Sequence, residues 1–512
     1  MNPSWTPDDL AQMRDLGISP GEVERQISLF KDPPPFARLA RPAALGDGIR
    51  SISGTEKEAL LERYGAARDA GRLSKFVPAS GAATRMFKTL MGLEAEGATR
   101  RADLEKKAEA GDQEALSALL LMDALPQVAF YADLKKAVAA GGGDLDALLR
   151  SGDFGPVWRC LLSEEGLGYG SRSKGLIQFH CHRDGPRTAL EEHLWEGLRT
   201  VKDARGDCRL HFTVSPEHRA EYEGRVKRLA EAIGAREGAR FLVDFSEQGK
   251  SYQTLAVDLD DRPFRDADGR LLFRPAGHGA LLPNLAGLGA DIVFIKNIDN
   301  VVVEEMLGPT LEWKKLLAGY LLEVQEGVHG HLARLEAGVP GAAAEAAEFI
   351  RRTLGAVPPA SEEGVRKFLD RPLRVCGVVP NTGEPGGGPF WVRDAEGKES
   401  LQIVEGAQVD PDSAEQRAIF RRSTHFNPVD LVCALRGPGG RPYALDPFVD
   451  PSAVFISRKS HQGRDLKALE LPGLWNGSMA GWITVLLEVP ASTFNPVKTV
   501  FDLLKPAHGG RS

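Results

Sequence analysis

The sequence predicts a three-layer α/β protein, in which helices cover both faces of a mixed but mostly parallel sheet. Short apolar runs alternate with longer amphipathic segments between residues 175 and 300, in the order GLIQFHC, TALEEHLWEGLRTVKDA, CRLHFTVS, PEHRAEYEGRVKRLAEAIGA, FLVDFSE and DIVFIKNIDN. Strands that alternate with helices in this way pair in parallel and carry their crossover helices on the faces of the sheet. The chain of 512 residues, 42% of them hydrophobic, is also long enough to bury a large core.

Composition divides the chain into three regions. Residues 1–75 are predicted as an N-terminal helical cap, because TPDDLAQMRDLG begins with Thr-Pro and an acidic cap and stops at Gly17. Residues 76–372 are predicted as the α/β core, with a helical insertion at about 99–151 that is rich in Ala, Leu, Lys and Glu. Residues 373–512 are rich in Gly, Pro and β-branched residues, and are predicted as a second β-rich part or a continuation of the sheet.

Charge and hydropathy exclude several classes of protein. Charged residues make up 26% of the chain and the formal net charge is −7, which favours neither a nucleic-acid-binding surface nor an acidic tail. The N-terminal stretch lacks the basic and apolar regions of a signal peptide, and no run of about 18 apolar residues is present to span a bilayer. We therefore expect a soluble, cytoplasmic protein with no nucleic-acid or membrane partner. The sequence does not indicate its oligomeric state.

Cysteine and histidine spacing gives little indication of a metal site. The five cysteines are scattered, odd in number and without CxxC spacing, which argues against a disulfide framework and a structural zinc site. In the triplet HCH, His180 and His182 would lie on the same face of a strand, but the pattern supplies no further ligand. We therefore do not predict zinc binding there.

The stretch FVPASGAATRMFK combines an apolar strand end with a turn of small residues and the start of a helix. This arrangement lets backbone N–H groups and a helix N-terminus meet an anion such as phosphate. Close packing of a strand on a helix is the alternative, and no Gly-Lys-Ser/Thr is present to complete a Walker A loop. The small residues and the two that follow them are Ser80, Gly81, Ala82, Ala83, Thr84 and Arg85.

Two further turns carry candidate site residues. DIVFIKNIDNVV is a buried strand that ends in Lys296, Asn297, Asp299 and Asn300, at the place where open α/β sheets bind ligands. Asp299 is a natural Mg²⁺ ligand there, whereas the alternative is an Asn-Asp turn that caps the next helix. FRPAGHGALLPNL contains a turn that either presses its backbone against a planar base or only reverses the chain; its residues are Gly277, His278 and Gly279.

The order of these motifs resembles that of the nucleotidyltransferases of the UDP-sugar pyrophosphorylase group. The family motifs GGxGTR, PKG, Pro-Gly-His-Gly and NxDN are similar here to residues 80–85, 173–175, 275–279 and 297–300. The resemblance implies a nucleotide-diphospho-sugar transferase fold of the glycosyltransferase A type. It also implies that residues 76–372 bind the nucleotide and that the C-terminal part binds an acceptor.

Later matches assign further residues by the same resemblance. LQIVEGAQVD is similar to the sugar-contacting stretch of the family, which places Glu405 and Gln408 near the acceptor. RSTHFNPVD and STFNPVKT are similar to two other family segments and assign Asn427 to the acceptor and Lys498 to the phosphates. Asn297 of the NxDN motif is assigned to the acceptor as well.

The resemblance implies a Mg²⁺-dependent nucleotidyltransferase of the uridylyltransferase type (EC 2.7.7). A phosphorylated acceptor, such as a sugar 1-phosphate, would attack the α-phosphorus of a nucleoside triphosphate, UTP by analogy, and pyrophosphate would leave. Asp299 would hold Mg²⁺, while Arg85, Lys174 and Lys498 would stabilise the phosphates.

The chain also departs from the family pattern. Ser80 and Ala83 replace two of the three motif glycines, and about ninety residues separate this motif from Lys174, where family members have a short link. As a whole the chain looks like a bacterial domain-of-unknown-function branch of the superfamily.

Alternatives remain open at this point. A nucleotide-sugar-binding or regulatory protein without turnover would fit the altered glycines, and a kinase or ligase would be a different ATP-dependent enzyme, although no signature for one is present. The single residues have simpler roles too: Lys174 at the surface, Arg85 paired with a helix acid, and Lys498 covering apolar surface.

Overall fold

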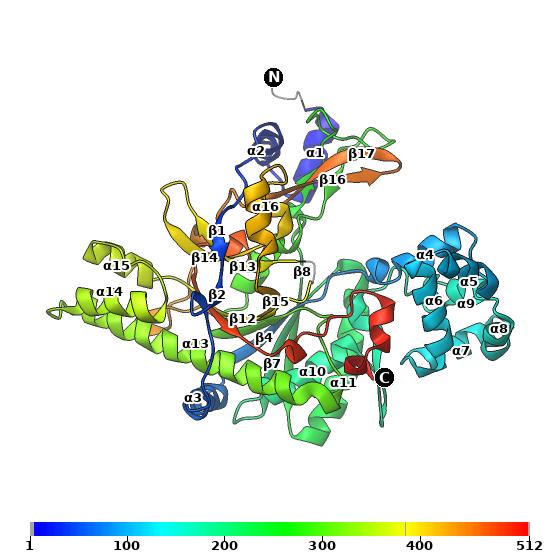
Figure 1. Ribbon diagram of the computed structural model, residues 1–512, viewed down its shortest axis with the longest axis horizontal. Helices are drawn as coiled ribbons and strands as arrows, with labels where there is room; N and C mark the ends of the chain where they lie inside the picture. The colour runs from blue at the N-terminus through cyan, green and yellow to red at the C-terminus, as the bar shows by residue number, and fades with distance from the viewer. Residues whose placement is uncertain (1–4, 384–385, 510–512) are drawn as a thin grey trace.

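The computed structural model describes residues 5–383 and 386–509, and a nine-stranded sheet forms its centre (Figure 1). Neighbouring strands follow one another across the sheet in an order far from that of the sequence. This order is β2 (Ala44–Leu45), β3 (Gly48–Arg50), β18 (Ile483–Glu488), β12 (Leu373–Pro380), β15 (His425–Ala434), β11 (Ile292–Lys296), β4 (Leu73–Pro78), β7 (Asp207–Val214) and β8 (Arg240–Glu247).

One strand of this sheet runs against the others. β15 is antiparallel to both of its neighbours, β12 and β11, whereas each of the remaining neighbouring pairs is parallel. The predicted mixed, mostly parallel α/β class is therefore confirmed. The carboxyl ends of eight strands and the amino end of β15 consequently meet at a single edge, which we call the carboxyl edge.

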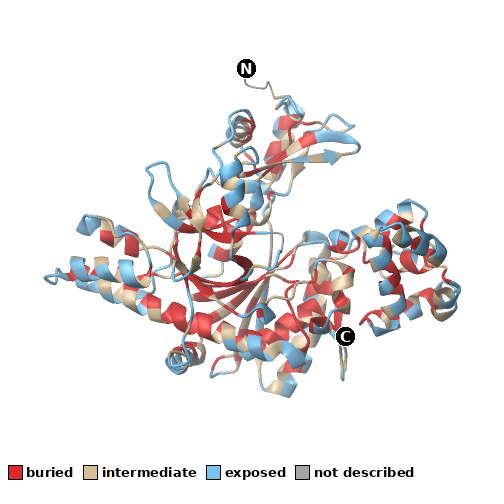
Figure 2. Cartoon of the chain, viewed as in Figure 1, coloured by how far each residue is buried: buried red, intermediate tan, exposed pale blue. Residues whose placement is uncertain are grey.

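Helices and a small second sheet cover the two faces of the central sheet, which makes three layers. On one face Phe294 packs in a core with the long helix α13, while its neighbours Val293 and Ile295 pack in a second core on the other face. Figure 2 shows buried residues along the strands and on the inner sides of these helices. The first face is covered by α3 (Lys57–Asp69), α10 (Ala189–Thr200), α11 (Arg219–Glu237) and α13 (Leu307–Glu336), and the second by α12 (Leu282–Ala286) and the sheet β1 (Arg38–Pro42), β13 (Gly388–Arg393) and β14 (Glu399–Val404).

A helical lobe lies beside the sheet, at the right of Figure 1. It spans residues 88–162 and includes the insertion predicted at about 99–151. Among the described residues no single helix is long and apolar enough to cross a membrane, and only the pair Gln113–Gln127 and Tyr131–Ala140, bent by 93°, reaches that length and composition together. The helices of the lobe are α4 (Lys88–Ala95), α5 (Arg101–Glu109), α6 (Gln113–Ala124), α7 (Tyr131–Ala140), α8 (Leu145–Ser151) and α9 (Gly155–Leu162).

The N-terminal region is not helical throughout, contrary to the prediction for residues 1–75. Helix α1 (Pro7–Leu16) forms as predicted, with Thr6 and Gly17 as caps at its two ends, and α2 (Pro20–Lys31) and α3 also lie within the region predicted as helical. The strands β1, β2 and β3 follow α2, with too few apolar residues to show a strand pattern in the sequence. Helices α1 and α2 pack away from the central sheet, against β9 (Thr254–Leu255) and β17 (Arg464–Glu470).

The remaining elements lie outside the central sheet. They are β5 (Gln178–His182), β6 (Gly185–Thr188), β10 (Phe273–Arg274), β16 (Phe455–His461), α14 (Ala342–Thr353), α15 (Glu362–Leu369) and α16 (Ala414–Arg421).

Candidate functional site

The loop of small residues after β4 lies at the carboxyl edge and is open to solvent. Gly81 and Ala82 are exposed, and a Cβ added at Gly81 would meet no atom within 4 Å. Arg85 is exposed too, and its side chain has no hydrogen-bond or ion-pair partner within residues 5–383 and 386–509, so the predicted alternative of a helix acid is not seen. One prediction needs correction: Ala83–Arg85 form a single 3₁₀ turn, and the α-helix begins only at Lys88.

The segment that carries Lys174 is hydrogen-bonded to this loop. Ala83 N donates to the carbonyl of Arg172 at 2.8 Å, and Lys174 N donates to the carbonyl of Gly81 at 3.2 Å. Gly175 is required at its position, because a Cβ there would lie 2.1 Å from the hydroxyl oxygen of Tyr222. The lobe α4–α9 therefore leaves and rejoins the core at two adjacent points, and the two motifs meet although it separates them in sequence.

Asp299 lies between two lysines. Its Oδ2 is 2.9 Å from Lys174 Nζ and 3.1 Å from Lys498 Nζ. Burial alone would raise the pKa of Asp299, but the ammonium groups of Lys498 and Lys174 hold this pKa below its usual value. Three residues that the sequence assigned to phosphate or metal binding are thus brought together from three distant segments.

The two lysines differ in exposure. The side chain of Lys174 is 12% exposed and also donates to the carbonyl of Val497 at 2.8 Å, whereas that of Lys498 is 58% exposed. Lys174 is therefore a fixed, nearly buried cation and not the surface residue of the alternative interpretation. Lys498 is free to move toward an incoming ligand.

The other carboxylate oxygen of Asp299 has no partner. Oδ1 is buried, and no hydrogen bond to it is found in the part of the chain that the structure describes. A buried carboxylate oxygen without a hydrogen-bond donor lowers the stability of the fold unless a bound ligand or ion interacts with it. Mg²⁺ is commonly held by one or two carboxylates together with phosphate oxygens. The residues present therefore fit a magnesium ion bound at Oδ1.

The Gly277–Gly279 turn packs tightly against a later segment. The His278 ring stacks on Trp475 with centroids 3.9 Å apart and 10° between the planes, and its Nδ1 accepts a hydrogen bond from Leu474 N at 2.8 Å. Gly277 has a φ of +75°, and a Cβ at Gly279 would lie 2.2 Å from the carbonyl oxygen of Pro472. These contacts account for the glycines and for His278 by packing, and they occupy one face of the imidazole.

The residues assigned to the acceptor do not form one cluster. Glu405 Oε1 lies 3.6 Å from His278 Nε2, and Gln408 Oε1 accepts from Glu405 N at 3.0 Å, so Gln408 serves as a local cap. Asn427 is buried at the start of β15, with an amide nitrogen that has no partner among the described residues. Asn297 is half-buried directly after β11. No hydrogen bond or ion pair joins these side chains to Asp299 within residues 5–383 and 386–509.

The structure corrects the predicted location of the Lys296 side chain. The sequence placed it with the polar groups at the strand end, but its ammonium points into the protein and lies 2.6 Å from Glu196 Oε2. Glu196 also contacts Lys75 at 2.8 Å and Lys314 at 3.6 Å, and Lys314 is 2.6 Å from Asp430. We call these five buried residues the central ion cluster. The isolated lysines of the apolar runs SKFVP and IVFIK were the only signal of it in the sequence.

The C-terminal segment was missed as a structural partner of the site. Val497 N donates to the carbonyl of Asp299 at 2.9 Å, and Asn495 N donates to Asn300 Oδ1 at 2.9 Å.

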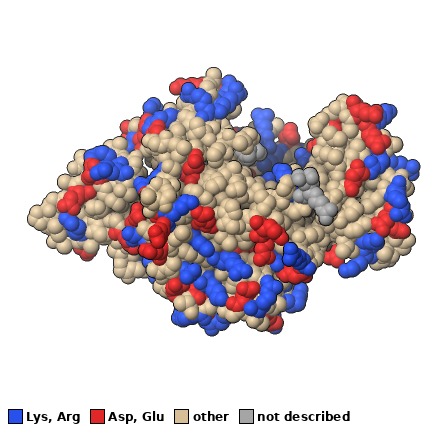
Figure 3. Space-filling view, turned by 60° about the horizontal axis from the view of Figure 1, so that its bottom comes forward, with Lys and Arg blue, Asp and Glu red and all other residues tan. Residues whose placement is uncertain are grey.

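Figure 3 shows a hollow between the main body and the helical lobe, with Lys and Arg side chains inside it. The positive charge of these side chains makes the hollow suited to an anionic ligand.

Comparison with known proteins gives a family and several similar structures. The solved structures similar to this chain include uridine diphosphate N-acetylglucosamine pyrophosphorylase from Trypanosoma brucei, with 14% identity over 96% of this chain and 76% of that one and a TM-score of 0.48. They also include UDP-glucose pyrophosphorylase from Leishmania major, with 14% identity over 98% and 79% and a TM-score of 0.45. No curated protein matches. Residues 6–509 match the model of a family described as "Domain of unknown function (DUF4301)", and the chain belongs to this family.

Proposed function

We propose that the protein is a nucleotidyltransferase that joins a nucleoside triphosphate to a phosphorylated acceptor, such as a sugar 1-phosphate, and releases pyrophosphate. One observation carries the proposal: Asp299 is held between Lys174 and Lys498 beside an open backbone loop at the carboxyl edge. A fixed cation, a movable cation and a carboxylate with a free oxygen are the groups that transfer of a nucleotidyl group needs. The choice of UTP rests on the motif resemblance.

The reaction requires that the acceptor phosphate and the leaving pyrophosphate be aligned at the α-phosphorus, and that the negative charge of the phosphates be neutralised. An oxygen of the acceptor phosphate forms a bond to the α-phosphorus, the bond from that phosphorus to the bridging oxygen breaks, and the electron pair leaves with pyrophosphate. Lys174 would hold the triphosphate in place, because its ammonium is nearly buried and anchored by Val497. Lys498 would leave Asp299 and neutralise the transferred group, and Arg85 would pair with the outer phosphates.

Gly81 and Ala82 would admit the phosphates to the backbone, since nothing covers Gly81. Asp299 Oδ1 would hold Mg²⁺, which when bound neutralises phosphate charge. The turn of Gly277, His278 and Gly279 would contact the base with the face of His278 that Trp475 leaves free. For the acceptor we retain Asn297, Glu405, Gln408 and Asn427 as proposed contacts.

The test is pyrophosphate release with Mg²⁺, each of the four common nucleoside triphosphates and a panel of sugar 1-phosphates. Lys498→Ala and Arg85→Ala should each lower turnover by about 10²-fold or more, because each removes a preorganised cation. Lys505→Ala is the matched control, since Lys505 is exposed and its ammonium pairs with Asp502 and not with Asp299 in the described part of the chain. Asp299→Ala should abolish release. A near-wild-type rate in any of the three site variants would remove that residue from the mechanism.

A second candidate is a nucleotide-sugar-binding or regulatory protein without turnover. The observation in its favour is that Ser80 and Ala83 stand where the resembled family has glycine, which narrows the approach of a phosphate to the backbone. Calorimetric titration with each triphosphate separates the two. Binding without release for any acceptor supports the second candidate, and absence of binding contradicts both.

A further inference from the structure

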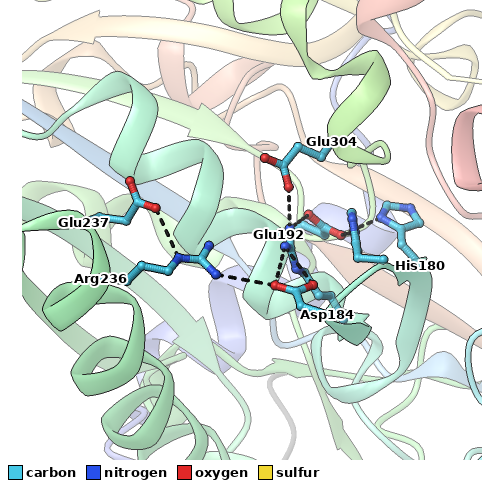
Figure 4. Close-up of polar contacts among 8 residues, drawn as sticks. His180, Asp184, Glu192, Arg236, Glu237 and Glu304 are labelled. Carbon is cyan, nitrogen blue, oxygen red and sulfur yellow. Dashed lines mark hydrogen bonds and ion pairs between the residues drawn. The ribbon is translucent and has the colours of Figure 1, made fainter.

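A histidine-rich cluster lies apart from the residues assigned to catalysis. His180 and His182 alternate along β5 and so project from the same face, and Glu192 comes from α10. Figure 4 shows His180 and Glu192 side by side. Glu192 Oε1 lies 2.8 Å from His180 Nδ1 and 2.6 Å from His182 Nε2. The three ligand atoms lie within 4.8 Å of one another, and the three side chains are at most 5% exposed.

The third ligand comes from a connection that the sequence did not reveal. β5 turns back through β6 (Gly185–Thr188), and the side chain of Thr188 then caps the N-terminus of α10. Glu192 lies in the first turns of this helix and so returns to the side of β5 that carries the two histidines. No ligand beyond the HCH triplet is readable in the sequence, because this return depends on the short antiparallel pair.

The surrounding charges favour a bound cation. Arg187 lies 4.0 Å from Glu192 Oε2 but is itself balanced by Asp184 at 3.1 Å and Glu304 at 3.2 Å. Arg236 lies between Asp184 and Glu237, as Figure 4 shows. Arg199 also lies 3.9 Å from Glu237. Four carboxylates thus face three guanidinium groups, which leaves the neighbourhood negative by one charge before a metal is counted.

We propose that His180, His182 and Glu192 form a binding site for a divalent first-row transition metal, and specifically for Zn²⁺. Two imidazole nitrogens and one carboxylate oxygen are typical zinc ligands, whereas Mg²⁺ prefers oxygen alone. With bonds of about 2.0–2.1 Å, tetrahedral ligand atoms lie about 3.3 Å apart. The present distances of 2.8 and 2.6 Å require the side chains to open by about 0.5 and 0.7 Å around the ion.

His508 supports the site from behind. Its Nδ1 lies 2.9 Å from His180 Nε2, on the ring nitrogen opposite to the one that faces Glu192, and the two rings stack with centroids 5.1 Å apart. Metal-bound histidines commonly use their second nitrogen in this way, which fixes the ring orientation. His508 belongs to the C-terminal segment that also carries Lys498. The metal would therefore join β5, α10 and, through His508, this segment.

Metal content and coordination test the proposal directly and do not depend on any catalytic activity. The full chain, exposed to Zn²⁺ and dialysed against metal-free buffer, should retain about one equivalent by elemental analysis. Co²⁺ should replace Zn²⁺ and give the visible absorption of a tetrahedral nitrogen and oxygen site. Both signals should be lost in Glu192→Gln, and in His182→Gln if the first variant does not fold. His508→Ala should weaken binding by about 10- to 100-fold.

Two controls keep the assignment specific. Glu304→Gln removes a carboxylate of the same charged neighbourhood that does not face the histidines, and Cys181→Ser removes the exposed thiol between the two histidines. Both should retain the metal and the Co²⁺ spectrum. Wild-type protein that binds neither ion, or Glu192→Gln and His182→Gln proteins that bind as much as wild type, would overturn the proposal.

Discussion

Replacement of Glu196 by glutamine tests how charge is balanced beneath the candidate site. The Glu196 carboxylate lies 2.8 Å from Lys75, 2.6 Å from Lys296 and 3.6 Å from Lys314, and these side chains are at most 2% exposed. Glutamine has nearly the same shape, so the substitution removes charge without opening a cavity. Lys75 and Lys296 would then lie in the interior with no carboxylate at ion-pair distance among the described residues. Burial already lowers the pKa of Lys75 to about 8, and without Glu196 this lysine would lose its proton more readily still.

The expected cost follows from the buried ion pairs that the substitution breaks. Removal of one partner from a buried ion pair costs about 3–5 kcal/mol, because the other charge stays buried and uncompensated. Glu196 serves two lysines at close range and a third at longer range, so we expect the upper end, about 5 kcal/mol. Because a folded domain is stable by only about 5–15 kcal/mol, this is a third or more of the total.

Urea unfolding followed by tryptophan fluorescence measures the effect as a lower free energy of unfolding. Glu348→Gln is the matched control, since Glu348 forms exposed ion pairs with Arg351 and Arg352 on α14 that contribute about 0–1 kcal/mol. If Glu196→Gln costs no more than Glu348→Gln, the reasoning about the central ion cluster is wrong.

Three further predictions follow from single positions. Gly81→Ala should leave the free energy of unfolding unchanged, because the added Cβ would meet no atom within 4 Å. It should weaken triphosphate binding by about tenfold or more if phosphates approach this backbone, and equal affinity by calorimetry would contradict this. Gly175→Ala should lower the thermal midpoint, because its Cβ would lie 2.1 Å from the Tyr222 hydroxyl oxygen, and an unchanged midpoint would refute the packing argument. Burial, then Lys75 and the other lysines nearby, holds the pKa of His193 well below its ordinary value. Below about pH 6.5 the unfolded chain therefore binds a proton that the folded protein does not bind, and the free energy of unfolding should decrease by up to about 1.4 kcal/mol for each unit by which the pH is lowered. This dependence is measured between pH 7.5 and 5.5, and a slope that is no smaller in His193→Gln would contradict the prediction.

The sequence was informative where a residue type serves a local geometry. Lys174, Asp299 and Lys498 were singled out from short motifs, and the structure brings them into contact. Asp299 follows β11 and Lys498 follows β18, two strands of the central sheet that end at the same edge, so their meeting follows from the class of fold. Lys174 instead precedes β5, which belongs to a separate two-stranded sheet, so its place beside Asp299 does not follow from the fold class. The strands β7, β8 and β11 of the central sheet were readable for a similar reason, since they depend on local periodicity. The predicted strand GLIQFHC instead forms β5 of a separate two-stranded antiparallel sheet.

Features that depend on distant partners were not readable. Nothing local distinguishes Lys296, which points into the core, from Asn297, which follows it at the strand end. The stacking of His278 on Trp475 joins segments far apart in the chain, and the same holds for Glu196 in the central ion cluster. Such contacts are decided by tertiary packing, on which sequence periodicity carries no information.

The order of strands also has a consequence for how the chain reaches its folded state. β3 pairs with β18 through Ile49 and Leu486, and β4 pairs with β11 through Leu73 and Ile292, so most strand neighbours are remote in sequence. Only β7 and β8 are close neighbours in sequence among the parallel pairs of longer strands, joined by the single crossover helix α11. Closing long loops before any pairing is gained makes such a sheet slow to form. We expect fragments of the chain to retain no part of the site, and binding of an anionic ligand to be recovered during refolding only with the complete sheet.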